Sequence, residues 1–366
     1  MTLSLVSAGE SHGPALVAIL SGLPADLVLE RAQIENDLAR RQQGYGRSPR
    51  QQIERDEIEV LAGLRQGRTL GTPLALVVRN RDHSHWTWGM NPWPPEGEPE
   101  GKGTETVTLP RPGHADLSGL LKHGFGDVRN VLERASARHT AVFVAAGSVA
   151  KQLLSTIGIE VAGSVLEIGG EGGEKQEHAA IDRARKDKDT LGGIIEVRAQ
   201  GVVPGLGSYA DKGDRLDGRL GQALMGIQAV KGVEIGEGFA LARVSGSQAH
   251  DEIFRDQRGY YRETNRAGGL EGGVTNGEAV VVRAAMKPIP TLMKPLRSVD
   301  VASGEPAEAL VERSDTTAVE ALAVVAEAAV AFELAKAAKE KFGGDSIGDF
   351  VAAHNAYLER IDWSPR

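Results

Sequence analysis

The distribution of apolar and polar positions along the chain predicts short β-strands in several regions. Within residues 1–28, two apolar segments with strand-like alternation flank a polar turn at Gly9–Gly13. Comparable patterns occur at residues 58–82, 158–168, 192–203 and 279–286. Because successive side chains of a strand point to opposite faces, such segments are typical of strands with at least one buried face.

Other segments carry apolar side chains at helical spacing. They cover residues 30–43, 127–157, 215–230 and 316–342. Thr317 and Glu320 have the spacing of a capping box, and glycines follow the last apolar position at 343 and 344. These signals predict where the last of these helices starts and ends.

The stretches between these elements are expected to form loops. Residues 84–110 are rich in Pro, Gly, Trp and Glu without periodicity, and long irregular loops of this kind are often functional or mobile. A charged, glycine-bearing loop is expected between the strands at 158–168 and 192–203, and a glycine-rich run at 232–238.

The order of these elements favours a layered α+β fold. Strands and helices are mixed without the strict alternation of a doubly wound sheet. Each half of the chain has strands followed by a long alanine-rich helix, which suggests two similar halves, although one sequence does not establish a repeat. No Pro- or Ser-rich linker separates them, so we expect a single catalytic domain over residues 1–366.

Composition narrows the class of protein. The 366-residue chain has a net charge of −8, which argues against the broad basic field of a nucleic-acid-binding protein. It has no cysteine, which excludes disulfides, thiolate metal sites and cysteine nucleophiles and favours a reducing compartment. The apolar run at 16–20 is too short for a signal peptide, and Glu320 and Glu327 interrupt the one at 318–332. A soluble, cytoplasmic enzyme is therefore expected.

Several familiar motifs are absent from the sequence. It contains no G-x-G-x-x-G, no G-x-x-x-x-G-K-[ST] and no H-E-x-x-H, so dinucleotide-fold, P-loop and zincin chemistry lack their main signatures. His83 and His85 form a pair suited to a metal, but no third ligand follows nearby, and no metal site is expected.

What remains is a series of glycine-flanked polar segments, each with two interpretations. Ser11 and His12 occupy a turn after a strand, where a structural role is more common than a catalytic one. The arginines at 40, 41, 47 and 50 surround Gly44–Gly46 and are either surface charges or an anion clamp, since guanidinium groups bind carboxylate and phosphate bidentately.

The later polar segments are equally ambiguous when taken singly. Arg111 and His114 follow the irregular loop, and the charges of residues 133–138 fit an exposed helix face. Lys287–Thr291 ends a strand with a cation and two prolines, and Asp315 suits a helix N-cap. A purely structural interpretation of each segment does not explain why all of them occur in one chain.

Taken in series, six segments resemble the chorismate synthase family in order and nearly from end to end. They are Gly9-Glu-Ser-His-Gly13, Gly44-Tyr-Gly-Arg47, Arg111-Pro-Gly-His-Ala-Asp116, Glu133-Arg-Ala-Ser-Ala-Arg138, Gly268-Gly-Leu-Glu-Gly-Gly273 followed by Thr275-Asn-Gly277, and Arg313-Ser-Asp315. Departures from the family pattern are Ser314 where many members have His, Ser48-Pro49 after Arg47, and a shorter region at 169–190.

The resemblance implies a β-α-β sandwich, a homotetramer and a defined reaction. The family converts 5-enolpyruvylshikimate 3-phosphate to chorismate and phosphate by a trans-1,4-elimination that requires reduced FMN. A phosphate and two carboxylates on the substrate account for an arginine-rich pocket in an acidic protein. Alternatives from other classes are a non-catalytic flavin- or anion-binding relative and a different flavoenzyme acting on a phosphorylated carboxylate.

The resemblance also assigns roles to individual residues. His12 would donate a proton to the leaving phosphate, His114 would stabilise the anionic reduced flavin, and Asp315 would face flavin N5 and assist removal of the C6 proton. The substrate-binding set would be Ser11, Arg41, Arg47, Arg50, Arg111, Arg138 and Arg313. The FMN-binding set would be Arg134, Ala135, Ser136, Gln228, Ala229, Gly272, Lys287, Pro288, Ile289, Pro290, Thr291 and Arg313. NADPH, a possible reductant, would use Arg41 and Arg47.

Overall fold

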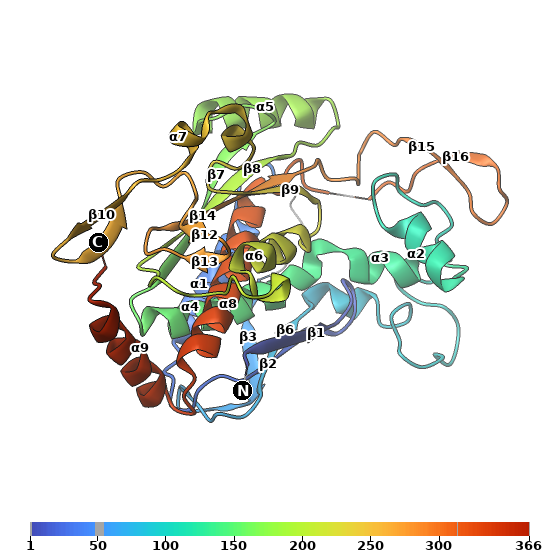
Figure 1. The fold of residues 1–366 in the computed structure, drawn as a ribbon. Helices are drawn as coiled ribbons and strands as arrows, with labels where there is room; N and C mark the ends of the chain where they lie inside the picture. Colours follow the sequence, from blue (N-terminus) through green and yellow to red (C-terminus); the bar gives the residue numbers. More distant parts are fainter. Residues whose placement is uncertain (1, 48–54, 313, 366) are drawn as a thin grey trace.

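A computed structural model describes residues 2–47, 55–312 and 314–365. These residues form two four-stranded antiparallel sheets with helices between them (Figure 1). The first sheet has the order β1 (Ser4–Ala8), β2 (Ala15–Ser21), β6 (Leu74–Arg79) and β3 (Ile58–Ala62). The second has the order β7 (Glu160–Ile168), β8 (Gly193–Gln200), β14 (Val280–Met286) and β9 (Val230–Ile235).

The two halves of the chain have the same topology. In each, two strands are followed by a helix, two more principal strands and a long helix. The helices are α1 (Arg31–Gln42) and α4 (Thr140–Ser155) in the first half, and α6 (Leu216–Met225) and α8 (Val319–Phe342) in the second. In both sheets the fourth strand of the chain order lies between the second and the third. The suggestion of two similar halves is therefore confirmed at the level of topology.

Helices α4 and α8 join the halves in the middle of the molecule. Helix α4 packs on β2 and β6, α8 packs on β7 and β8, and the two helices contact each other. A Cβ atom at Gly147 of α4 would lie 2.3 Å from the Cβ of Ala328 in α8. Only small side chains permit this approach, which explains why both helices are rich in alanine. One apolar core contains residues of both sheets and all four helices.

Shorter elements surround this core. The remaining helices and 3-10 turns are η2 (Arg81–His85), α2 (Asp116–His123), α3 (Arg129–Ala135), η3 (Ala137–His139), α5 (Glu174–Lys186), η4 (Lys212–Asp214), η5 (Gly238–Arg243), α7 (Gly246–Ala249) and α9 (Ile347–Ile361). The two-stranded hairpins are β4 (Leu64–Arg65) with β5 (Arg68–Thr69), β10 (Ile253–Asp256) with β11 (Gly259–Arg262), β12 (Leu270–Glu271) with β13 (Val274–Thr275), and β15 (Arg297–Val299) with β16 (Pro306–Glu308). None of the described helices is both long and apolar enough to cross a membrane.

Several sequence predictions about elements are corrected. The expected charged loop after β7 contains helix α5. This helix buries only Ala180, Ile181 and Ala184, so its apolar periodicity is too weak to be recognised among the charged residues. Strand β9 extends into the glycine-rich run at 232–238, for which the sequence predicted no element, because hydrogen bonding to β14 overrides the weak strand propensity of glycine. The helical pattern at 127–157 is divided at Ser136, and α9 lies beyond the helix that was expected to be the last long one.

The start of α8 also differs from its prediction. Residues 315–317 stay non-helical, since Thr316 donates its N–H to Gly46 O and accepts one from Leu191 at its own carbonyl. Helix α8 therefore begins at Val319 without a side-chain cap, and Asp315 is not its N-cap. A reciprocal capping box is present at α9, between Ser346 and Asp349.

Candidate active site

A cavity of about 430 Å³, which we call the main cavity, lies where the ends of α1, α3 and α8 meet the segment that follows β14. Its size is that of a small-molecule site. The predicted residues on its wall are Ser11, His12, Arg41, Arg47, Arg111, His114, Ala135, Ser136, Arg138, Gln228, Ala229, Lys287, Ile289, Pro290, Thr291 and Asp315. The fold thus gathers segments that are more than 300 residues apart in the sequence, since Asp315 shares this wall with Ser11.

Five predicted residues are missing from this wall: three are described and lie elsewhere, and two lie outside the described residues. Arg134 donates hydrogen bonds to Gly9 O and Ser7, and Gly272 lies in the turn between β12 and β13. Pro288 is next to a wall residue without lining the cavity itself. Arg50 and Arg313 lie outside the described residues.

His12 occupies the turn between β1 and β2 and is buried against α3. Its Nδ1 lies 2.9 Å from a carboxylate oxygen of Glu133, and its ring stacks on Trp86 with centroids 4.0 Å apart. Burial alone would raise the pKa of Glu133, but hydrogen bonds from His12 and the charge of Arg129 outweigh it and hold this pKa below its ordinary value. An ionised carboxylate therefore lies beside the imidazole.

Two arginines on the wall share one buried carboxylate. Asp56 accepts from Arg138 Nη1 at 2.7 Å and from Arg41 Nη1 at 3.3 Å, and its side chain has no exposed surface. Arg41 also donates from Nε to Thr140 Oγ1 at 2.9 Å. Burial lowers the pKa of Arg41 to about 10 although Asp56 opposes this effect, so the guanidinium stays charged at neutral pH.

A third arginine, Arg47, forms an ion pair with Asp315. Its Nη1 lies 2.9 Å from the carboxylate, and both side chains are mostly buried. The turn that carries Arg47 requires Gly46, which has φ +91° and leaves space for Ile181 of α5. Arg47 Nε is buried without a hydrogen-bond partner among the described residues, which suits an anion that binds in the cavity.

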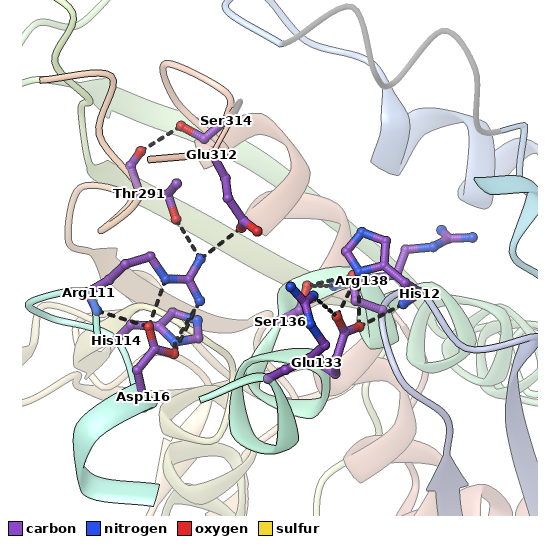
Figure 2. A network of polar contacts seen from close by, with 12 residues as sticks. His12, Arg111, His114, Asp116, Glu133, Ser136, Arg138, Thr291, Glu312 and Ser314 are labelled. Atoms are coloured by element: carbon purple, nitrogen blue, oxygen red, sulfur yellow. Dashed lines mark hydrogen bonds and ion pairs between the residues drawn. The ribbon is translucent and has the colours of Figure 1, made fainter. Parts of the chain in front are cut away.

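The second histidine belongs to a separate polar cluster on the wall. Figure 2 shows the cluster of Arg111, His114 and Asp116 apart from that of His12 and Glu133. His114 Nδ1 lies 2.5 Å from Asp116, and Arg111 donates from Nε to the same carboxylate at 2.8 Å and from Nη1 to Thr291 at 3.0 Å. Burial opposes ionisation of Asp116, but hydrogen bonds from His114 and Arg111 outweigh it and lower its pKa strongly.

Apolar side chains complete the wall. They are Leu132, Ile227, Met286, Leu322 and Val325, with Ile289 and Pro290 beside them. Lys287 places its ammonium group at Gly113 O, and Ala229 has a left-handed backbone with φ +66°. Such strain in a non-glycine residue is characteristic of ligand-binding segments. An apolar wall with cations at its edge fits a flat heteroaromatic ring that bears a phosphate.

Sequence reasoning missed several residues that shape this site. Asp56 lies in a charged run that is typical of a surface, and Asn80 ends a strand without any motif, yet Asn80 Oδ1 accepts from Arg138 Nε at 2.9 Å. Trp86 belongs to the irregular loop, and only the functional tendency of such loops could have pointed to it.

The histidine pair of the same region has protein partners. His83 Nδ1 lies 2.9 Å from His12 O, and His85 Nδ1 lies 3.1 Å from Asp82. Within the described ranges there is no group of three or more side chains that could hold a metal ion.

Comparisons with known proteins agree in one family. Residues 3–338 match the family model described as chorismate synthase. Chorismate synthase from Desulforudis audaxviator is 53% identical over 386 aligned positions, covering 98% of both chains. The enzyme of that name from Pelobacter propionicus is 52% identical, covering 98% of this chain and 99% of the relative. A crystal structure of chorismate synthase superimposes with a TM-score of 0.79 at 38% identity, covering 99% of each chain.

Proposed function

The chain belongs to the chorismate synthase family, and we propose that the main cavity is where it binds 5-enolpyruvylshikimate 3-phosphate and reduced FMN. Members of this family are lyases of the shikimate pathway that release phosphate from this substrate to give chorismate. The observation that carries the proposal is the collection of four arginines and two histidines on one cavity wall in an acidic chain. Guanidinium groups bind phosphate and carboxylate, and this ligand carries one phosphate and two carboxylates.

Arg47, Arg111 and Arg138 are proposed to contact the substrate anions together with Ser11. Arg50 and Arg313 stay in this set as proposals from the sequence. Arg41 donates to Thr140, Asp56 and the carbonyls of residues 137 and 138, so its main contribution is a fixed positive charge behind the wall. If NADPH binds as reductant, Arg47 is the better placed of the two arginines assigned to it.

His12 is proposed to protonate the leaving phosphate. As the C–O bond breaks, its electron pair stays on the phosphate oxygen, and a proton from the imidazolium neutralises the charge that develops there. Asp315 is proposed to assist removal of the C6 proton, and Arg47 holds its carboxylate at the cavity wall. His114 is proposed to place positive charge beside the cofactor ring, supported by the ionised Asp116.

The residues present fit a reduced flavin. The apolar wall suits the ring system, and Ala135, Ser136, Gln228, Ala229 and Lys287–Thr291 supply hydrogen-bonding groups and a cation along it. When bound, reduced FMN supplies the electron density that the elimination requires. Arg134, Pro288 and Gly272 stay proposals from the sequence, because they do not line the main cavity.

We also propose a single catalytic domain, a cytoplasmic location and a homotetramer. The outer face of the first sheet supports association, since Val6 and Leu61 are 68% and 60% exposed and Val6 pairs with the exposed Ile19. Light scattering after size-exclusion chromatography tests the tetramer, and a monomer at micromolar concentration would contradict it.

The test of function mixes the purified protein anaerobically with reduced FMN and 5-enolpyruvylshikimate 3-phosphate. Chorismate and phosphate should form in equal amounts without net oxidation of the flavin, and oxidised FMN should not support turnover. Binding of both ligands without phosphate release would instead identify a non-catalytic relative. Net flavin oxidation in step with product would identify a different flavoenzyme.

A further inference from the structure

Glu133 makes contacts with both the backbone and the ring of His12. Its carboxylate accepts from His12 N at 2.9 Å and from His12 Nδ1 at 2.9 Å and 3.0 Å. Its own carbonyl accepts from Ser11 N at 3.0 Å. Because Nδ1 is directed at this carboxylate, proton transfer from this ring to a ligand would use Nε2.

Trp86 fixes the plane of the same imidazole. The two rings are nearly parallel, with an interplanar angle of 18°. Trp86 is itself held by Arg129, whose guanidinium lies 4.9 Å from its ring centroid, and by Asp82, which accepts from Trp86 Nε1 at 3.0 Å. Rotation of the His12 ring would break the stacking and the hydrogen bonds to Glu133 at the same time.

Among the described residues, the charged groups around His12 come from three segments. Helix α3 contributes Glu133 and Arg129, which form an ion pair at 3.2 Å. The η2 segment contributes His83 and Asp82, and the irregular loop contributes Lys102, which lies 3.3 Å from Asp82. Glu133 is the anion in direct contact with the imidazole, and it balances the positive charge that this ring carries when it acts as a general acid.

We infer that Glu133 and Trp86 are positioning residues that hold the His12 ring with its protonated Nδ1 on Glu133, so that the proposed proton transfer to the leaving phosphate uses Nε2. This inference rests on the proposed function of His12 as the general acid. The proton moves from Nε2 to the phosphate oxygen as the C–O bond breaks, while Glu133 stays ionised and neutralises the imidazolium before transfer. An orienting carboxylate of this kind acts only through its histidine.

The decisive experiment is a double-mutant cycle between Glu133→Gln and His12→Ala in the holoenzyme. Glu133→Gln should lower kcat about 10–100-fold with little change in KM, and the alkaline limb of its rate–pH profile should move to lower pH. In the His12→Ala background the same substitution should lower kcat by less than about twofold, because its effect passes through the imidazole. Equal losses in both backgrounds would overturn the inference.

Further variants separate positioning from folding. Glu327→Gln is the matched control, because Glu327 is also buried and ion-paired, but its partners Arg40 and Lys151 do not line the main cavity, whereas His12, the partner of Glu133, does. It should lower stability without moving the rate–pH profile. Should Glu133→Gln fail to fold, Glu133→Asp is measured in both backgrounds instead, and Trp86→Leu should lower kcat about 2–10-fold at unchanged KM. A displaced profile in Glu327→Gln, or unchanged kcat in the two replacement variants, would overturn the inference.

The cycle also distinguishes this inference from the proposed function. If His12→Ala leaves turnover unchanged, the assignment of the general acid is wrong, and the positioning role is overturned with it. If His12→Ala lowers turnover but Glu133→Gln does not, only the positioning role is overturned.

Discussion

Replacing Asp56 by Asn should destabilise the protein strongly because it removes the carboxylate shared by Arg41 and Arg138. Both guanidiniums contact Asp56, at 3.3 Å and 2.7 Å, and their side chains are only 8% and 10% exposed. Asn preserves the size of the side chain but leaves two nearly buried cations without their shared counter-ion. Breaking a buried ion pair in this way costs about 3–5 kcal/mol. We expect the free energy of unfolding in urea to fall by that amount.

Inorganic phosphate should restore part of this loss. An anion that binds only the folded state stabilises it by RT ln(1 + [L]/Kd), where [L] is the free anion concentration, and the variant leaves more uncompensated positive charge at the main cavity. Phosphate should therefore raise the unfolding midpoint more steeply in the variant than in the native protein. The assay is urea unfolding followed by circular dichroism at several phosphate concentrations.

The control for this prediction is Glu59→Gln. Glu59 forms an exposed ion pair with Arg79 at 2.9 Å, and its removal should leave the urea midpoint nearly unchanged because solvent screens exposed pairs. If Asp56→Asn costs as little as this control, or if phosphate stabilises both proteins equally, Asp56 does not balance the cavity arginines and the reasoning is refuted.

Three further predictions concern other parts of the structure. Ser346→Ala removes the capping box of α9 and should lower the free energy of unfolding by about 1 kcal/mol, and an unchanged urea midpoint would contradict it. Gly46→Ala should raise the substrate KM about tenfold, because its left-handed φ is costly for alanine and the added Cβ would collide with Ile181. The control Gly97→Ala, at φ +94° with no atom within 4 Å of the added Cβ, should leave KM unchanged. Burial lowers the pKa of His139 and of His354, so the unfolded chain takes up more protons as pH falls through about 6.5 and stability should decrease over that window. Urea unfolding at pH 7.5 and 5.5 measures this decrease, and His354→Gln should reduce it.

Part of the site was predictable from the sequence because its residues come in compact segments. Ser11 and His12 occupy one turn, and Arg111 and His114 occupy another. The residues of each pair are close in the sequence, so they lie close in space whatever the tertiary fold. The family resemblance assigned these segments to one pocket, and the main cavity gathers them. Most helices and strands were predictable for a similar reason, since their apolar periodicity is a local property.

Elements without a broad apolar face were not predictable in this way. Helix α5 buries only three side chains, so its sequence resembles a charged loop. The helix matters for the site through tertiary contacts. His178 stacks on Tyr45 with ring centroids 3.9 Å apart, and Asp182 accepts a hydrogen bond from the Tyr45 hydroxyl at 2.9 Å. These contacts hold the turn that carries Arg47, and no local pattern indicates them.

The sequence by itself determined the α+β class, the order of the main elements and the polar segments that identify the family. The tertiary structure decided which charges neutralise one another. Asp56 and Arg138 are 82 residues apart, and His12 and Glu133 are 121 apart, yet each pair is in direct contact. Local propensity is set by neighbours within a few residues, whereas the partner of a buried charge is set by how the sheets and helices pack. That is why Asp315, which has the local signature of a helix N-cap, forms an ion pair with Arg47 instead.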